Sequence, residues 1–142
     1  MPELPEVEAV CRKLRRDAAG ARIVSAHIQR RRITHPQPPE HVEALACRRV
    51  IHSVERRGKN LFVNLSGGFS LHVHLRMTGN LYVAADRRLR PASLSAWFAL
   101  DDGRGLFFED PRGLGTLTLV DAAGKAARVA EKIGRASCRE RV

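Results

Sequence analysis

The apolar residues near the start of the chain recur with the period of an α-helix. Between Pro5 and Ala18 they are three or four positions apart, and basic side chains occupy the positions between them. One apolar face and one charged face predict an amphipathic helix. Gly20 is placed to end it, because glycine readily adopts the left-handed conformation that follows many helices. The apolar positions are Val7, Val10, Cys11, Leu14 and Ala18.

Short β-forming segments separated by turn residues follow this helix. Glycine-containing turns at 66–68 and 101–103 predict hairpins, and the prolines of 36–39 predict a loop that leads into a short helix near 40–46. Arg87–Pro91 is expected to be a solvated, charged loop. The pattern predicts a mainly β fold, with one N-terminal α-helix laid on an antiparallel β-sandwich of about eight strands. The expected strands are 22–29, 50–55, 61–65, 69–74, 81–84, 95–100, 105–108 and 116–120.

Length and charge limit the class of protein. The 142 residues are enough for one domain with a buried core. Lys and Arg number 25 against 15 Asp and Glu, which gives a formal net charge of +10. Such an excess favours a partner rich in phosphate, and nucleic acid is the leading candidate. From charge alone, a basic RNA-binding or ribosomal-type protein is the alternative.

The compartment follows from what the sequence does and does not contain. It has neither a long apolar run nor a signal peptide, so we expect a cytoplasmic protein without membrane contact. Cys11, Cys47 and Cys138 are too scattered for a zinc site and too few for a disulfide scaffold. Reduced, mostly buried thiols are therefore expected.

Residues 132–142 have a separate interpretation. Their sequence, KIGRASCRERV, resembles the translation of a common short-read sequencing adapter. We therefore interpret 1–131 as the domain and 132–142 as an adapter-derived artefact tail. Four basic residues and one acidic residue give this tail a charge of +3, so +7 remains for 1–131. The basic character survives its removal.

The opening residues, MPELPEVE, contain a candidate nucleophile. Removal of Met1 would expose the secondary amine of Pro2, and an N-terminal amine has a pKa of about 7.7–8. A useful fraction is then unprotonated near neutrality and can attack an aldehyde-like sugar carbon. Glu3, directly beside it, can move protons. The alternative is an ordinary helix start, since proline and acidic residues both favour a first turn.

Two further segments combine a strand with a turn. In RRGKNLF, Lys59 stands at a turn that enters a strand, where its cation can be held at the edge of the sheet. The alternative to such a functional role is a basic turn that only contacts solvent. In HVHLRMTGNL, a strand with His72 and His74 ends in a loop that contains Met77. A plainer reading makes Met77 a core residue and the histidines surface positions. The two histidines face the same side of a strand, but no third ligand is evident, so no metal site is predicted.

The fourth segment, EDPRGLG, is a loop with Arg112 and Leu114. The guanidinium of Arg112 can pair with the hydrogen-bond acceptors of a base. Leu114 is apolar and can wedge into a stack of bases. The alternative is an ordinary Pro-Gly turn with an exposed arginine.

In their order along the chain, these four segments resemble the formamidopyrimidine-DNA glycosylase family over about residues 1–130. Enzymes of this family excise oxidised purines and then cut the strand. The resemblance implies that Pro2 forms the Schiff base, that Glu3 relays protons and that Lys59 is the catalytic lysine. Leu4 favours the oxidised-purine branch, with 8-oxoguanine and formamidopyrimidine substrates, over the endonuclease VIII branch.

The resemblance also implies which residues hold damaged double-stranded DNA. His74 matches a phosphate-binding histidine, and Met77 matches the side chain that fills the place of the extruded base. Arg112 matches the arginine that contacts the orphaned base. Two positions depart from the family: Gly113 stands where a second basic residue is usual, and Leu114 where phenylalanine is. Leucine lacks aromatic stacking, which predicts weaker or altered discrimination of the opposite base.

The family's second half, a helix-two-turn-helix domain and a four-cysteine zinc finger, is not among these residues. No Cys-x-x-Cys pair is present. We therefore expect a monomeric, nucleoid-associated bacterial protein that needs no cofactor in this chain, one structural zinc in the missing part, and weak or no turnover from this chain alone. A non-catalytic DNA-binding member with the same fold is the alternative.

Overall fold

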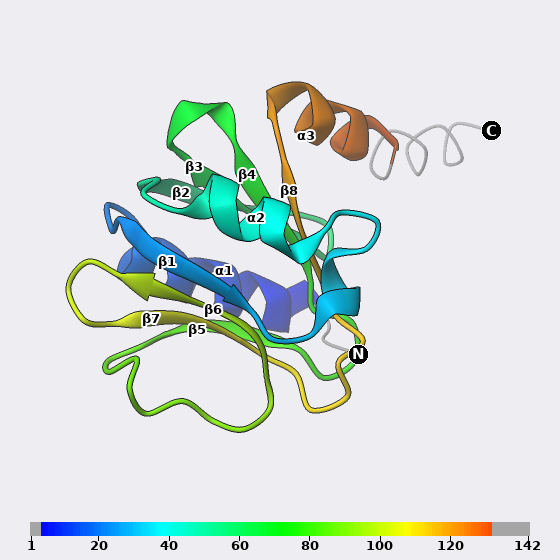
Figure 1. The fold of residues 1–142 in the computed structure, drawn as a ribbon. Helices are drawn as coiled ribbons and strands as arrows, with labels where there is room; N and C mark the ends of the chain where they lie inside the picture. The colour runs from blue at the N-terminus through cyan, green and yellow to red at the C-terminus, as the bar shows by residue number, and fades with distance from the viewer. Residues whose placement is uncertain (1–3, 132–142) are drawn as a thin grey trace.

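Residues 4–131 are described by the computed structural model, and they form two antiparallel four-stranded sheets packed face to face (Figure 1). The strand order is β1-β6-β7-β5 in one sheet and β2-β3-β4-β8 in the other. The predicted sandwich of eight strands with an N-terminal helix is confirmed. The strands are β1 (Ile23–Ile28), β2 (Ile51–Arg57), β3 (Asn60–Leu65), β4 (Ser70–His74), β5 (Asn80–Ala84), β6 (Leu94–Leu100), β7 (Gly105–Glu109) and β8 (Thr116–Val120).

Helices close the two open sides of the sandwich. α1 (Leu4–Ala18) contacts the edge strands β2 and β5, whereas α2 (Pro39–Ala46) contacts the opposite edge strands, β1 and β8. A short 3-10 helix, η1 (Arg31–Thr34), leads from β1 to α2 and packs against β8. Edges covered in this way are protected from pairing with another chain. The residues that α1 buries are those of the predicted apolar face, Val7, Cys11, Leu14 and Ala18.

The core lies between the sheets, and the turns fall where glycine permits them. Phe98 on β6 and Phe108 on β7 are fully buried, and each such side chain contributes roughly 1.5–3 kcal/mol to folding.

η2 (Ser66–Gly68) joins β3 to β4, and Gly103, at φ 89°, lies in the turn between β6 and β7. Gly20, at φ 88°, follows α1 as predicted. Both predicted hairpins are confirmed.

One helix was not predicted. α3 (Ala122–Val129) lies against β4 and β8, and the side chain of Asp121 caps it by accepting the N–H of Gly124 at 2.7 Å. None of its residues is buried. It is held by polar contacts instead, among them an ion pair between Lys125 and Glu55 on β2. Its apolar positions recur at helical spacing, but they are mostly alanines and none of them is buried.

The loop between β5 and β6 differs in part from the expectation. Arg88 is exposed, but Arg87 donates to the carbonyl oxygen of Leu100 at 2.6 Å, and the guanidinium of Arg90 lies 4.1 Å from the ring centroid of Trp97. The prediction of a solvated loop holds for Arg88 and Arg90, which are exposed, whereas Arg87 is partly buried and bound to the sandwich. A guanidinium is weakly hydrated and planar, so it packs readily on an aromatic face.

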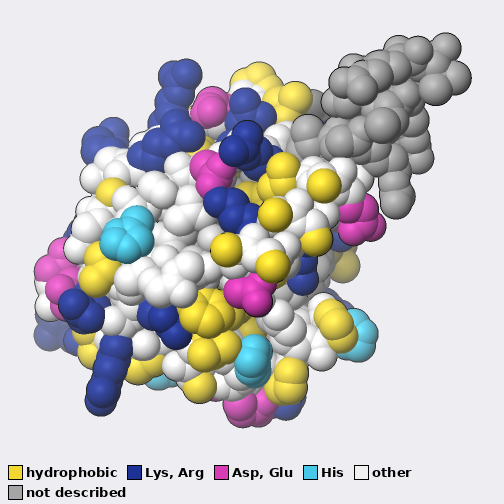
Figure 2. Space-filling view, turned by 90° about the horizontal axis from the view of Figure 1, so that it is seen from above, with side chains coloured by type: hydrophobic (Ala, Val, Ile, Leu, Met, Phe, Trp, Pro, Cys, Tyr) yellow, Lys and Arg dark blue, Asp and Glu magenta, His cyan; other side chains and the backbone are white. Residues whose placement is uncertain are grey.

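The charge of the surface is mixed on the face that carries α2 and α3. Figure 2 shows Lys and Arg side chains spread over this face, with Asp and Glu side chains between them. The positive charge is thus partly balanced there. Among residues 4–131, no helix has both the length and the apolar character needed to cross a membrane.

Candidate nucleic-acid interface

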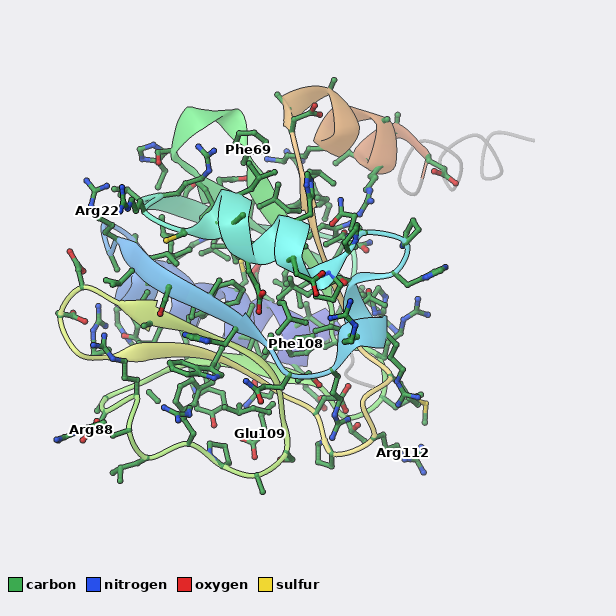
Figure 3. All side chains as sticks on the ribbon, in the orientation of Figure 1. Arg22, Phe69, Arg88, Phe108, Glu109 and Arg112 are labelled. Carbon is green, nitrogen blue, oxygen red and sulfur yellow. The ribbon has the colours of Figure 1, made fainter. Side chains whose placement is uncertain are left out.

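Four connections meet at one end of the sandwich: the β2–β3 turn at 58–59, the β1–η1 connection at 29–30, the β4–β5 loop at 75–79 and the β7–β8 loop at 110–115. They lie together because the first residue of β3 pairs with the last of β4, which pairs with the first of β8. In the other sheet, the first residue of β5 pairs with the last of β7. Figure 3 labels Arg112, which projects from this end.

Pro2 and Glu3, the predicted nucleophile and proton relay, lie outside the described residues. The helix that follows them is fastened at this end by Arg56. Its Nε lies 3.3 Å from Oε1 of Glu8 on α1, and its Nη1 donates to the carbonyl oxygen of Gly58 at 3.0 Å. Arg56 therefore connects the first half of α1 to the β2–β3 turn, a positioning role that was not predicted from the sequence.

Lys59 and His74 lie at the same end of adjacent strands. Lys59 is half-buried, follows Gly58 (φ 63°) in the turn and precedes Asn60, which pairs with His74. Nδ1 of His74 accepts the backbone N–H of Arg76 at 3.1 Å. An accepting Nδ1 places the proton of a neutral ring on Nε2, which makes Nε2 a donor of the kind that a phosphate oxygen accepts.

The β4–β5 loop presents Met77 to solvent. The Met77 residue is 50% exposed, so the plainer reading of it as a core residue is wrong. Arg76, just before it, has φ 57°, a left-handed conformation that costs a non-glycine residue roughly 1–2 kcal/mol. The N–H of Gly79 donates to the carbonyl oxygen of Leu75 at 3.0 Å and closes the loop. A strained loop that exposes an apolar side chain is typical of a functional site.

Gly79 gives the first stability prediction. A β-carbon there would lie 2.5 Å from the carbonyl oxygen of Leu75 and 3.1 Å from the buried ring of Phe108. We expect Gly79→Ala to lower the free energy of unfolding in urea by about 1–3 kcal/mol, because neither neighbour can easily move. Gly68→Ala is the control: it has a positive φ of 81°, but its β-carbon would meet nothing within 4 Å. Gly68→Ala shows the cost of a positive φ without a clash, so an unchanged free energy of unfolding for Gly79→Ala, which has no positive φ, would contradict the steric argument.

Asp110 fastens the β7–β8 loop to the β4–β5 loop. The residue is fully buried; Oδ1 accepts the hydroxyl of Thr78 at 2.5 Å and the N–H of Arg112 at 3.2 Å, and Oδ2 accepts the N–H of Gly115 at 2.8 Å. Burial raises the pKa of Asp110, but hydrogen bonds from Thr78 and from backbone N–H groups outweigh it and hold the pKa below its ordinary value. Asp110 is the second residue of the EDPRGLG segment and had no predicted role. Its position before a proline and two glycines was the available signal.

The β7–β8 loop exposes both residues that were predicted to touch the bases. Arg112 is exposed, and so is Leu114, at 49%. Between them Gly113 is buried and has φ 68°. The structure thus brings Met77, Arg112 and Leu114 to one end of the molecule, on two loops that share the carboxylate of Asp110.

His72 has a structural role. It is 8% exposed, and its ring stacks on Phe62 with 4.5 Å between centroids. Its Nδ1 and Nε2 lie 2.9 Å from Nη1 of Arg128 and from Oδ1 of Asn60, respectively. Over residues 4–131, no three His, Cys, Asp or Glu side chains are grouped so that they could hold a metal ion.

Comparison with known proteins identifies the family. The family model for the N-terminal domain of formamidopyrimidine-DNA glycosylase matches residues 1–117. The chain belongs to the formamidopyrimidine-DNA glycosylase family. The formamidopyrimidine-DNA glycosylase of Chloroflexus aggregans is 41% identical over 128 residues, which cover 89% of this chain and 46% of the relative. That of Roseiflexus sp. is 41% identical over 134 residues, which cover 89% of this chain and 47% of the relative.

Solved structures of formamidopyrimidine-DNA glycosylases have the same fold. The Lactococcus lactis enzyme in complex with abasic-site DNA superposes with a TM-score of 0.85 at 27% identity, over 92% of this chain and 48% of that one. Its complex with DNA containing formamidopyrimidine-dG gives a TM-score of 0.84 at 28% identity, with the same coverage. The chain spans about half the length of the curated relatives it matches.

Proposed function

We propose that this chain carries the lesion-processing half of a DNA glycosylase that acts on oxidised purines in duplex DNA. One observation supports this above the others: the loop end of the sandwich gathers Lys59, His74, Met77, Arg112 and Leu114 beside the first turns of α1. Relatives that bear the name formamidopyrimidine-DNA glycosylase, and neighbours solved with lesion-containing DNA, support the same substrate class.

In the proposed reaction, the amine of Pro2 attacks C1′ of an extruded damaged nucleoside. A C1′–N bond to Pro2 forms as the glycosidic bond breaks and the base leaves with a proton. The sugar ring then opens to an iminium, which draws electrons from C2′ and makes the C2′ proton acidic. Glu3 relays protons at the sugar, and a positioned acid–base group of this kind contributes roughly 10²–10⁴-fold.

Strand cleavage follows from the same intermediate. Loss of the C2′ proton sends its electron pair into the C2′–C3′ bond as the C3′–O bond breaks, which releases the 3′ phosphate. A second elimination then releases the 5′ phosphate. We assign Lys59 to phosphate contact and proton donation during the first elimination, and neither elimination requires a metal or an organic cofactor. This activity is that of a DNA-(apurinic or apyrimidinic site) lyase.

The exposed loop residues suit a duplex in which one damaged nucleoside has been extruded from the stack. Extrusion costs a few kcal/mol and leaves a gap in the stack. The flexible, apolar Met77 can fill that gap, Arg112 can pair with the orphaned base, and Leu114 can separate it from its neighbour. His74 donates from Nε2 to a backbone phosphate. We place the protein, as a monomer, on chromosomal DNA in the bacterial cytoplasm.

A single-turnover assay tests this proposal. Excess protein is incubated with a duplex that contains one 8-oxoguanine opposite cytosine, and half of each sample is treated with hot alkali to reveal base loss without a nick. We expect slow base loss followed by nicking on the damaged duplex, none on the undamaged one, and few further turnovers. DNA binding without base loss would favour a non-catalytic DNA-binding protein. Rapid multiple turnover would contradict the expected weakness of this chain alone.

A further inference from the structure

Two arginine side chains, those of Arg30 and Arg32, lie over Gly113. A side chain at position 113 would overlap the Arg30 guanidinium, and its β-carbon would lie 3.0 Å from Nη2 of Arg32. Nη2 of Arg32 also donates to the carbonyl oxygen of Arg112 at 3.2 Å. The β1–η1 connection therefore lies directly over the loop that carries Arg112 and Leu114. Glycine at 113 is what makes room for these guanidinium groups.

The cluster has no acidic partner among the residues that the structure describes. Neither Arg30, Arg32 nor Arg112 takes part in an ion pair there, whereas Arg31, between the first two, pairs with Glu40 at 2.6 Å. The nearby carboxylate of Asp110 already accepts one hydroxyl and two backbone N–H groups. Like charges held this close repel one another unless an anion lies between them.

We infer that Arg30 and Arg32 form, over Gly113, a binding site for one backbone phosphate of the strand that carries the orphaned base. This inference rests on the proposed function. Guanidinium groups bind phosphate oxygens through paired, charge-assisted hydrogen bonds. The strand follows from the position of the cluster, because Gly113 lies between Arg112 and Leu114, the two residues assigned to the orphaned base and its stack. A phosphate beside that nucleotide falls next to Gly113.

The inference also accounts for a departure noted in the sequence. Gly113 replaces a second basic residue of the related motif, which by itself removes a positive charge from the loop. In this chain Arg30 brings its guanidinium over the backbone of residue 113, so the charge comes from the β1–η1 connection. A phosphate held there fixes the backbone of the orphaned nucleotide while Arg112 contacts its base. Arg30 and Arg32 therefore act as positioning residues for base recognition.

The experiment compares three single variants of the 142-residue chain: Arg30→Gln, Arg32→Gln and, as the matched control, Arg31→Gln. Binding to a short duplex with one tetrahydrofuran abasic site opposite cytosine is measured by fluorescence anisotropy over a series of salt concentrations. The slope of log K against log salt is negative, and each lost phosphate contact reduces its magnitude by about 1. We expect that decrease for Arg30→Gln and Arg32→Gln but not for Arg31→Gln, with thermal unfolding used to verify that each variant is folded.

A second arm needs no variant. In the unmodified protein, single neutral methylphosphonate linkages beside the orphaned nucleotide should reduce the magnitude of the slope by the same amount, and linkages at the same distance on the damaged strand should not reproduce the Arg30 effect. Unchanged slopes in both arms, or a slope change confined to the damaged strand, would overturn the inference. Borohydride trapping on an abasic duplex is run in parallel. A cross-link with unchanged slopes would contradict this inference alone. The expected slopes without a cross-link would contradict the proposed chemistry alone. Absence of any duplex binding would contradict both.

Discussion

An additional residue left in front of Pro2 should reduce nicking of an abasic duplex to the level seen without protein. The reason is chemical: an amide nitrogen has no available lone pair and cannot form an iminium with C1′. Pro2→Gly keeps an N-terminal amine, but a primary and more mobile one, so we expect nicking to fall by roughly 10²-fold. The measurement is the fraction of strand cut with protein in excess, with base release scored separately.

The matched control for this prediction is Arg88→Gln. Arg88 lies in the β5–β6 loop, is exposed and pairs with Asp86, two positions before it, so nicking should be unchanged. Thermal unfolding should also be the same for all variants, because none of these changes alters a side chain of the core described within 4–131. Nicking that survives a blocked N-terminus would remove Pro2 from the mechanism.

Replacing Asp110 by alanine should be the most destabilising change at the loop end. It would leave the hydroxyl of Thr78 and the N–H groups of Arg112 and Gly115 without their acceptor in a buried place. We expect a loss of about 3 kcal/mol in the free energy of unfolding, measured in urea, together with weaker duplex binding. The stability of Asp110→Asn should lie between those of the natural protein and Asp110→Ala, since its amide offers one acceptor oxygen where three donors converge.

The effect of Asp110 should depend on pH in a defined direction. Its pKa is lower in the folded protein than the value of about 3.9 expected for the unfolded chain. A depressed pKa stabilises the fold above the unfolded value, and that contribution is lost as the pH falls through about 4 towards the folded pKa. The difference in stability between the natural protein and Asp110→Asn should therefore shrink below pH 4. Asp86→Asn, which alters an exposed pair, is the control and should change little at any pH. A difference that stays constant down to low pH would contradict the role of the carboxylate.

Much of the fold was readable because its signals are local. The three-to-four spacing of Val7, Cys11 and Leu14 marks α1, and glycines at positive φ mark the ends and turns. The strands alternate or are continuously apolar, so their number and approximate positions along the chain could be predicted, but not their order in the two sheets. The helix that packs on the outer face of the β2-β3-β4-β8 sheet could not be predicted. α3 has alanines at helical spacing, but none is buried, and Lys125 and Arg128 hold the helix through contacts to the sheet that the local sequence does not show.

The candidate site was only partly predictable for a similar reason. Met77, Arg112 and Leu114 were found from their motifs, and their exposure agrees with contacts to a partner. The residues that hold them were missed, because Arg56, Asp110 and Arg30 act on segments far away in the sequence. A sequence shows that Gly113 lacks a basic side chain. Only the three-dimensional structure shows which guanidinium occupies the space above it.

The central claim is that the N-terminal proline is the nucleophile of a DNA-lesion site, and it is tested by locating the covalent bond. The protein is mixed with an abasic duplex, reduced with borohydride and digested with a protease and a nuclease, and the modified peptide is identified by mass spectrometry. Our account predicts that the sugar remnant is attached to the amine of Pro2 after loss of Met1. A remnant on Lys59 or another lysine, or no adduct under conditions where the duplex is bound, would contradict it.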